Sequence, residues 1–383
     1  MVKPGYKQTE VGLIPENWEC VPLLEKTRLL NGLTYTPENV KEYGLLVLRS
    51  SNVQNSKLSF EDTLFVDCVV SDEKKIKEGD ILVCVRNGSA ALIGKCAQAD
   101  RDYDATFGAF MAVLRGEHND YIHQILQQGT IQKEISKNSG ATINQITNGD
   151  FKLIWIVLPG DKAEEKAIAE ALSHVDRMIS AYEKLILKKK AIKQGAMQEL
   201  LTGKRRLPGF SGEWENILLK KALTVGHGMA QHRVESPEGK YPILATGGMI
   251  GKATQYLWDK PSVLIGRKGT INKPQYMDKP FWSIDTLFFT KINEGYCPKF
   301  LYYVFCRIDW LSYNEASGVP SLSSKTIENI SVRIPEYPEQ VVIAELLSEM
   351  DSEIITLEQK LEKYRQLKQG MMQQLLTGKI RLV

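Results

Sequence analysis

Apolar residues recur in alternating steps of four and three along two long stretches of the chain, a spacing typical of α-helices that pack in a coiled coil. The first stretch has its apolar seam at Ile168, Leu172, Val175, Ile179, Tyr182, Ile186 and Leu200. The second has its seam at Ile343, Leu347, Met350, Ile354, Leu357, Leu361, Tyr364, Met371 and Leu375. The first stretch predicts a helix over 163–201, roughly 39 residues or about 58 Å at 1.5 Å per residue, and the second seam is of equal length.

Shorter apolar runs bounded by turn residues precede each predicted helix. The strand-like runs are 45–48, 79–85 and 153–158 in the first half, and 241–244, 262–265 and 285–290 in the second. Helical stretches around 121–137 and 299–311 separate some of these runs. The pattern predicts a mixed α/β segment in each half of the chain.

The run Leu-Leu-Thr-Gly-Lys-Arg-Arg-Leu at 200–207 returns 175 residues later, at 375–382, as Leu-Leu-Thr-Gly-Lys-Ile-Arg-Leu. Each copy closes a predicted helix, and its glycine suits the left-handed residue that ends many helices. Helix capping is a sufficient reason for any single residue of the run. A match at a fixed offset, however, indicates that a whole unit is duplicated. Trp18 and Trp214 follow the starts of the two units, and we expect both to be core anchors.

The duplication divides the chain into globular segments 1–160 and 204–337 and helical spacers 161–203 and 338–383. We therefore expect an α+β protein in which two mixed α/β domains are joined by two long antiparallel helices that form an intramolecular coiled coil. The last copy of the repeat stops where a third unit would begin, which favours a cyclic, pseudo-two-fold arrangement with both chain ends close together. Intermolecular pairing of the seams competes with this arrangement, so the isolated chain is open to self-association.

Composition adds limits to this interpretation. The 383 residues carry a net charge of +3, a weak signal beside the strongly basic balance of many nucleic-acid binders. Residues 1–160 contain 17 basic and 20 acidic side chains, whereas residues 204–338 contain 18 and 12. A polyanion would therefore meet the first segment through a local basic face. No apolar run reaches the roughly 20 residues of a membrane span. Six cysteines without Cys-x-x-Cys spacing suit a cytoplasmic protein with reduced thiols.

A cluster of lysines lies on the first predicted helix. A solvated face is the simplest interpretation, and contact with phosphates or with an acidic partner is the alternative. The cluster consists of Lys184, Lys188, Lys189, Lys190 and Lys193.

Sequence motifs for catalysis are missing. The run 247–253 has the wrong spacing for a phosphate-binding loop, and neither Gly-x-Ser-x-Gly nor His-Glu-x-x-His is present. The Asp/Asn-Pro-Pro-aromatic loop of amino-methyltransferases is absent as well. His227 and His232 lack nearby cysteines for a metal site. We therefore expect a binding protein with no cofactor and no metal ion, and not an enzyme.

Two variable segments, each followed by a long helix that ends in Leu-Leu-Thr-Gly-Lys-x-Arg-Leu, resemble the specificity subunit of type I restriction–modification systems. The resemblance extends over essentially the whole chain, and the order and duplication of its motifs make it specific. Its further motifs are Lys7-x-Thr9-x-x-Gly12-x-Ile14-Pro15-x-x-Trp18, Thr-Gly-Gly-Met-Ile-Gly at 246–251 and Ile-Gly-Arg-Lys-Gly-Thr at 265–270.

The resemblance implies that each globular segment is a target-recognition domain that reads one short half-site in double-stranded DNA. It also implies that the helices are spacers that dock methyltransferase subunits, which carry S-adenosylmethionine and the adenine methylation chemistry. A restriction subunit would add an ATP-driven motor and cleavage. Because the two segments differ outside the shared framework, the half-sites should differ too. Helix length should then set the unread spacer between them.

Side chains in loops after strands are best placed to read bases. In the first segment we select Arg49, Ser51, Asn52, Arg86, Asn87, Lys95 and Asn144. In the second we select His227, Arg233, Thr246, Arg267, Lys268, Lys273 and Ser321. Arginine can make two hydrogen bonds to guanine, and asparagine can do so to adenine. A solvated charge or a turn-capping amide is the competing interpretation. Arg86 and Arg267 stand out because both precede a glycine in framework positions that match.

Two other functions stay open from the sequence. One is a coiled-coil protein-interaction scaffold without specific DNA binding, which predicts no salt-dependent retention on DNA. The other is an enzyme with an unrecognised site, which assays of the lone chain for nuclease or methyltransferase activity would reveal.

Overall fold

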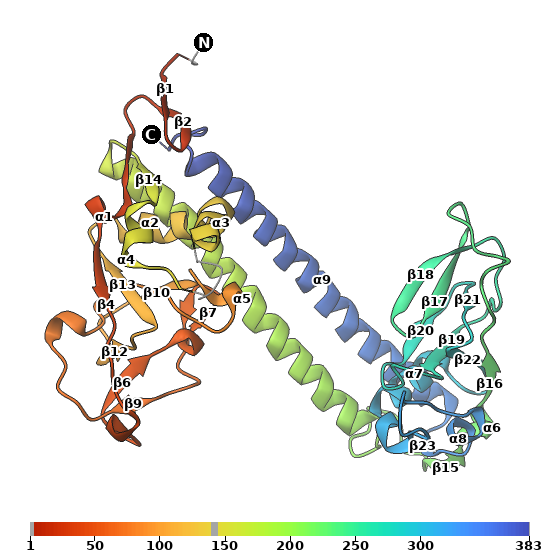
Figure 1. Cartoon of the computed structure of the whole chain (residues 1–383). Coiled ribbons are helices and arrows are strands. Elements are labelled where there is room, and N and C mark those ends of the chain that lie inside the picture. The colour runs from red at the N-terminus through yellow and green to blue at the C-terminus, as the bar shows by residue number, and fades with distance from the viewer. Residues whose placement is uncertain (1–3, 139–144, 383) are drawn as a thin grey trace. The chain divides into compact units, whose positions relative to one another are not determined.

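The computed structural model describes residues 4–138 and 145–382. Its contacts divide the chain into two compact units: unit 1 is Met1–Ala181 with Leu361–Val383, and unit 2 is Tyr182–Lys360. Both chain ends belong to unit 1, where the hydroxyl of Tyr6 donates to the carbonyl of Gly378 at 3.1 Å (Figure 1). The predicted proximity of the two ends is confirmed. The units cut through the long helices, so the four-segment division of the chain stays a prediction about the roles of its parts.

Two helices of 39 residues each dominate the chain: α5 (Lys162–Leu200) and α9 (Tyr337–Leu375). The first agrees with the seam-based prediction to within one residue at each end. Each helix is followed by a glycine in the left-handed region, Gly203 with φ 71° and Gly378 with φ 66°. A residue with a Cβ is strained there, so glycine ends both helices as the repeated run predicts.

Unit 1 contains two four-stranded sheets. The main sheet is antiparallel, in the order β11-β10-β13-β4. Its strands are β4 (Arg28–Asn31), β10 (Ile81–Cys84), β11 (Cys96–Gln98) and β13 (Met111–Arg115). The second sheet has the order β12-β6-β9-β5, with β6 and β12 parallel. Its strands are β5 (Val40–Lys41), β6 (Leu45–Leu48), β9 (Phe65–Val66) and β12 (Ala105–Phe107).

Smaller elements complete unit 1. The paired strands are β1 (Tyr6–Thr9) with β2 (Gly12–Pro15), β7 (Val53–Gln54) with β8 (Lys57–Leu58), and β3 (Glu19–Pro22) with β14 (Trp155–Leu158). The helices are α1 (Leu23–Lys26), α2 (Asn119–Leu126), α3 (Gly129–Asn138) and α4 (Asn148–Lys152). The 3₁₀ turns are η1 (Pro37–Asn39), η2 (Ser50–Asn52), η3 (Asp72–Lys74) and η4 (Ala90–Leu92).

Unit 2 repeats this design. Its main sheet has the order β16-β22-β19-β20, and its second sheet has the order β18-β17-β21, with β17 and β21 parallel. The main strands are β16 (Leu223–His227), β19 (Ser262–Gly266), β20 (Gln275–Met277) and β22 (Leu287–Ile292). The others are β15 (Glu215–Leu218), β17 (Tyr241–Ala245), β18 (Gly248–Ala253), β21 (Trp282–Ser283) and β23 (Ser331–Ile334). The helical elements are α6 (Leu219–Ala222), α7 (Pro298–Arg307), η5 (Trp310–Tyr313) and α8 (Ser324–Glu328).

The two units share one topology. The order β11-β10-β13-β4 corresponds strand by strand to β20-β19-β22-β16, and each unit adds one parallel pair, β6 with β12 or β17 with β21. In each unit an antiparallel ribbon joins the first strand after Trp18 or Trp214 to the last strand before a long helix, β3 with β14 or β15 with β23. The duplication indicated by the repeated run is therefore a duplication of a mixed α/β fold.

The ends of the long helices are part of the two cores. In unit 1, Ile168 and Leu172 of α5 and Leu375 of α9 belong to the same buried cluster as Trp18. In unit 2, Leu200 and Leu347 join the cluster of Trp214. Trp18 is fully buried and Trp214 is 6% exposed, so the prediction that both anchor a core is confirmed.

Within each unit the two helix segments run antiparallel. In unit 1, Glu164 pairs with Arg381 and the later Asp176 pairs with the earlier Lys368. In unit 2 the order is reversed in the same way (Lys190 with Glu358, and then Lys193 with Asp351). The buried seam residues are Ile168, Leu172, Val175, Ile186, Leu200, Ile343, Leu347, Ile354, Leu357, Leu361 and Leu375. Half-buried are Ile179, Tyr182, Met350, Tyr364 and Met371.

Candidate nucleic-acid interface and spacer contacts

Loops around Arg86 and Phe110 lie together beyond the carboxyl end of β10 in unit 1, and we call this end of the unit its loop edge. The backbone N–H groups of Val85 and Arg86 both donate to the carbonyl of Phe110, at 3.0 and 3.1 Å. Arg86 also forms a β-bridge with Gln145. The guanidinium carbon of Arg86 lies 5.2 Å from the ring centroid of Phe110, and both side chains are exposed. The edge therefore presents a cation stacked on an aromatic ring.

The turn after β6 lies beside this edge. The amide of Asn87 donates to the hydroxyl of Ser50 at 3.0 Å, which links the end of β10 to the turn that holds Arg49 and Ser51. The carbonyl of Lys95 accepts from the N–H of Cys84 at 2.9 Å, so Lys95 lies at the same strand end. The structure thus brings five of the residues selected from the sequence to one edge: Arg49, Ser51, Arg86, Asn87 and Lys95.

Arg49 and Asn52 also have structural partners within this turn. One guanidinium nitrogen of Arg49 donates to both carboxylate oxygens of Asp62 at 2.9 Å. Asn52 is fully buried, accepts from the N–H of Arg49 and donates to the carbonyls of Ser59 and Asp62. In this structure Asn52 is a turn-capping amide, the competing interpretation of such residues. Asn144 lies outside the described residues.

Unit 2 has a matching loop edge beyond β19. The N–H groups of Arg267 and Lys268 donate to the carbonyl of Thr286 at 2.8 and 3.3 Å, and Lys268 forms a β-bridge with Ser321. The amide of Gln275 donates to the carbonyl of Thr246 at 3.3 Å, which holds the tip between β17 and β18 against this edge.

Three further selected residues belong to unit 2. His227 ends β16, is exposed, and packs its ring edge-on against Phe288 with centroids 5.0 Å apart. Arg233 is exposed between β16 and β17, and Lys273 is exposed between β19 and β20. Lys273 lies at this end of the unit because the connection between β19 and β20 begins here. Arg233 does not, because its neighbours Val234 and Glu235 contact Thr254 and Ala253 at the end of β18 away from the tip.

The loop edges of the two units correspond to each other, but their matching residues are shifted by one from the pairing of Arg86 with Arg267 that the sequence predicts. The N–H of Ile146 donates to the carbonyl of Val85 at 2.8 Å, and that of Leu322 donates to the carbonyl of Arg267 at 3.0 Å. Val85 is therefore the counterpart of Arg267, and Arg86 is the counterpart of Lys268. The pairing of Arg86 with Arg267 was wrong because it aligned two unlike glycines: Gly269 has φ 87°, whereas Gly88 is outside the left-handed region.

A close backbone contact holds the turn in front of each edge. A Cβ on Gly32 would lie 2.0 Å from the carbonyl oxygen of Gly108, and one on Gly228 would lie 1.9 Å from that of Ile284. Both glycines directly follow the outer strand of the main sheet, β4 or β16. Only glycine permits this approach, which sets the turns that carry Phe110 and Thr286.

Exposed apolar side chains lie at both edges, whereas the residues predicted from the sequence are all polar. Phe110 is 56% exposed, and Met249 and Ile250 at the tip between β17 and β18 are 59% and 50% exposed. A signal was present for the tip, because a Gly-Gly turn followed by apolar residues predicts an exposed hairpin. Phe110 had no such signal, since its position follows a buried strand.

A buried carboxylate joins the tryptophan to the repeated run in unit 1. The indole N–H of Trp18 donates to Glu164 at 3.2 Å, and Arg381 donates to the same carboxylate at 2.6 and 2.7 Å. The Arg381 guanidinium carbon lies 5.6 Å from the Trp18 ring centroid. Burial alone would raise the pKa of Glu164, but the hydrogen bonds from Arg381 and Trp18 outweigh it and hold the pKa below its ordinary value.

Unit 2 repeats this contact with the counterpart residues. Trp214 donates to Glu339 at 3.2 Å, and Arg206 donates to it twice at 2.7 Å. Arg206 and Arg381 are the same position of the repeated run. Capping explains the glycine of that run, but its arginine holds the start of the other long helix. We call each set of three residues a Trp-Glu-Arg clamp.

Each unit also has an ion pair in the otherwise apolar seam. Lys368 lies 2.6 Å from Asp176 in unit 1, and their counterparts Lys193 and Asp351 pair in unit 2. Neither lysine is more than 19% exposed. A polar pair in an apolar seam penalises shifted registers, because a shift leaves a charge buried without its partner.

Three lysines of the cluster on the first helix form ion pairs, and the other two are exposed. Lys189 and Lys190 form ion pairs with Glu353 and Glu358 at 2.7 and 2.6 Å, and Lys193 is the seam residue. Lys184 and Lys188 are exposed. Within residues 4–138 and 145–382, no cluster of three or more His, Cys, Asp or Glu is placed to hold a metal ion, and no helix has the length and apolarity of a membrane span.

The duplicated fold, with one loop edge per unit and paired spacer helices, defines a protein class with two unlike domains on one repeated scaffold. The family model described as "Type I restriction modification DNA specificity domain" matches the chain twice, over residues 15–193 and 212–368. These matches include most of the chain, which therefore belongs to this family of specificity subunits, each with two target-recognition domains.

Curated relatives agree with this assignment. The chain is 32% identical to the EcoKI specificity subunit of Escherichia coli K12 over 61% of this chain and 54% of that protein. It is also 32% identical to the StySPI specificity subunit of Salmonella potsdam, over 50% of this chain and 44% of that one. These alignments span about half the length of those relatives. A putative MjaX specificity subunit from Methanocaldococcus jannaschii is 24% identical over 99% of this chain and 97% of that one.

Solved structures show the same fold. The S subunit of a type I restriction-modification system from M. genitalium matches with a TM-score of 0.69 at 17% identity, over 97% of this chain and 98% of that chain. A chain from a structural study of type I complex assembly matches with a TM-score of 0.55 at 14% identity, over 96% and 99%.

Proposed function

We propose that this chain selects the DNA target of a type I restriction–modification complex, reading an asymmetric bipartite site with two different domains and docking the methyltransferase subunits. The proposal rests on one observation: the loop edges of the two units have the same backbone arrangement but carry different side chains. The same backbone hydrogen bonds form both loop edges, yet they present Arg86 and Phe110 in unit 1 and Lys268 and Thr286 in unit 2. Two edges of this kind suit two different half-sites.

The contacts proposed for double-stranded DNA are the selected side chains that the structure leaves exposed or half-buried. Arg86 is exposed and oriented by Phe110, so its guanidinium suits a guanine edge or a phosphate. Other contacts are assigned to Arg49, Ser51, Asn87 and Lys95 in unit 1, and to His227, Arg233, Thr246, Arg267, Lys268, Lys273 and Ser321 in unit 2. Asn52 is left out because its amide is buried and bonded.

Exposed residues repeated on the long helices and just after them support docking of a partner that binds twice. Lys190, Gln194, Gln198 and Lys204 are matched at an offset of 175 by Arg365, Gln369, Gln373 and Lys379, and all eight are exposed. Folding does not demand that exposed side chains be alike in both copies, and the loop edges are unlike. We call these eight residues the repeated stripe and assign it to the methyltransferase subunits.

Catalysis is assigned to the partners. Methylation would belong to the methyltransferase subunits, and motor activity and cleavage to a restriction subunit, with this chain in the cytoplasm and without a cofactor of its own. Without partners, the repeated stripe is uncovered, which is the reason to expect self-association of the isolated chain.

Methylation mapping tests the proposal. The chain is co-expressed with the methyltransferase subunit from the same source, and methylated adenines are located across the host DNA. The expected result is one motif with two unlike halves and an unread spacer. Absence of any methylated bipartite motif from an assembled complex would count against it. The scaffold alternative predicts no salt-dependent DNA retention and no effect of combining Arg86→Ala with Arg267→Ala.

A further inference from the structure

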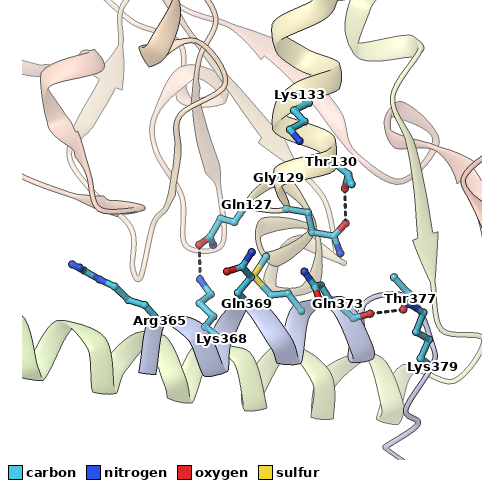
Figure 2. A pocket seen from close by; sticks show the side chains of 12 residues that line it. Gln127, Gly129, Thr130, Lys133, Arg365, Lys368, Gln369, Gln373, Thr377 and Lys379 are labelled. Atoms are coloured by element: carbon cyan, nitrogen blue, oxygen red, sulfur yellow. Dashed lines mark hydrogen bonds between the residues drawn. The ribbon is translucent and has the colours of Figure 1, made fainter. Parts of the chain in front are cut away.

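A cavity of about 600 Å³ lies in unit 1 between the start of α3 and the last turns of α9 (Figure 2). Lys133 and Thr130 line it from α3, while Arg365, Gln369 and Gln373 line it from α9. Lys379, which follows α9, also lines it. Neither loop edge contributes a residue to this cavity, so it is separate from the proposed DNA contacts.

The lining has one sign of charge. Of its 12 lining residues, all within the described part of the chain, four are basic and none is acidic; the basic ones are Lys133, Arg365, Lys368 and Lys379. Lys368 is held by Asp176 at 2.6 Å and donates to Gln127 at 2.6 Å. All four basic residues add positive potential, and no acidic side chain lines the wall, so the cavity attracts an anionic ligand.

Met372 gives the cavity an apolar floor. It lines the cavity, is 8% exposed and belongs to the buried core of unit 1. A ligand that fits both features carries negative charge and an apolar side chain together. The phosphate backbone of DNA supplies only the charge, whereas an acidic segment of a protein supplies both.

The α9 wall repeats on α5. Arg365, Gln369 and Gln373 are members of the repeated stripe, as is Lys379, and Met372 is matched at the same offset by Met197. The exposed apolar residue Leu367 is likewise matched by Ile192. Apolar positions kept on an exposed helix face favour a protein as the ligand.

We infer that this cavity binds an acidic segment of the protein that docks on the long helices. Carboxylates of that segment lie against Lys133, Arg365 and Lys379, and an apolar side chain lies against Met372. The inference rests on the docking part of the proposed function and names the chemistry of the docked segment.

A defined peptide tests the inference on the full chain. The probe is a fluorescein-labelled peptide of sequence Glu-Glu-Leu-Leu-Glu-Glu, measured by fluorescence polarisation, with Lys-Lys-Leu-Leu-Lys-Lys as the charge-reversed peptide. Combining Lys133→Glu with Lys379→Glu should weaken binding of the acidic peptide about tenfold. Lys166→Glu reverses an exposed lysine of the same unit outside the cavity and should leave the affinity unchanged. Circular dichroism confirms that each variant is folded.

Three outcomes overturn the inference. They are no binding of the acidic peptide, equal binding by the double variant, and displacement of the peptide by a short oligo-dT, which would make the cavity a phosphate site. Failure of the proposed function is separate. If the peptide binds as expected but the methyltransferase subunit does not co-purify with the chain, the docking assignment fails while the acidic-ligand site stands.

Discussion

Arg381 and Glu164 are 217 residues apart in the chain, yet the guanidinium of one binds the carboxylate of the other through hydrogen bonds of 2.6 and 2.7 Å. Arg206 and Glu339 make the same contact in unit 2. In each unit an arginine that follows one long helix holds the first turn of the other, beside the tryptophan of the core. The two clamps thus tie the helices and the globular part of each unit into one folded structure.

Removing the arginine of a clamp should destabilise its unit. Arg381→Ala leaves the carboxylate of Glu164, which is 1% exposed, without its charged partner. The expected loss is about 3 kcal/mol in the free energy of unfolding, measured by urea denaturation. Lys379→Ala, an exposed position two residues earlier, should change it by less than about 0.5 kcal/mol. Equal stability of the two variants would show that the clamp does not stabilise the unit.

Buried His123 should make stability depend on pH. Its pKa is lowered from the ordinary 6.5 to about 4, mainly by burial and also by Lys368, while Asp176 and Asp120 act in the opposite direction. The unfolded chain therefore binds this proton first. The stability is complete above about pH 6.5 and is lost toward pH 4, by about 1.4 kcal/mol per pH unit.

A substitution checks this pH dependence. His123→Gln should flatten the fall in the free energy of unfolding between pH 6.5 and pH 4, whereas His174→Gln, at an exposed position of α5, should leave it as in the wild type. If the free energy of unfolding of His123→Gln fell with the same slope, the pH dependence would arise from other groups. Glu164 has a lowered pKa, so its protonation causes a separate loss of stability below about pH 4.5. The His123→Gln variant should show this loss as well.

The seam ion pair should behave as a coupled pair in a double-mutant cycle. Lys368→Asp and Asp176→Lys each place two like charges together in a largely buried position, and each should cost about 2 kcal/mol of stability. The charge-swapped double variant should recover at least about 1 kcal/mol of the summed loss. The matched cycle in unit 2 uses Lys193 and Asp351. Simple additivity would show that the pair does not specify the helix register.

Phe110 should matter for DNA and not for folding. Because its ring is 56% exposed, Phe110→Ala should change stability by less than about 0.5 kcal/mol. If Phe110 and Arg86 contact DNA, the variant should weaken DNA binding by about 1–3 kcal/mol in a band-shift assay of the assembled methyltransferase complex. Methylation mapping should show relaxed recognition in one half of the target only. Tyr43→Ala, which removes a 77% exposed ring at the opposite end of β6, is the control.

Local pattern was sufficient for some features and insufficient for others. The heptad spacing located α5 to within one residue, and the repeated glycine identified both helix ends. Asn52 shows the limit: an exposed base reader and a buried turn cap have the same sequence signature, a polar residue after a strand. The counterpart of Arg86 was misassigned for the same reason, since a glycine in sequence does not reveal its φ angle.

By itself the sequence determined the duplication, the two 39-residue helices and the mixed α/β class, because periodicity and repeats are properties of neighbouring residues along the chain. Only the tertiary structure decided that the arginine of the repeated Leu-Leu-Thr-Gly-Lys run closes a clamp on a buried glutamate. It likewise decided which seam lysines meet which aspartates, and that Lys268 is the counterpart of Arg86. These contacts join residues more than 100 positions apart or depend on backbone hydrogen bonds between separate strands, and only packing brings such groups together.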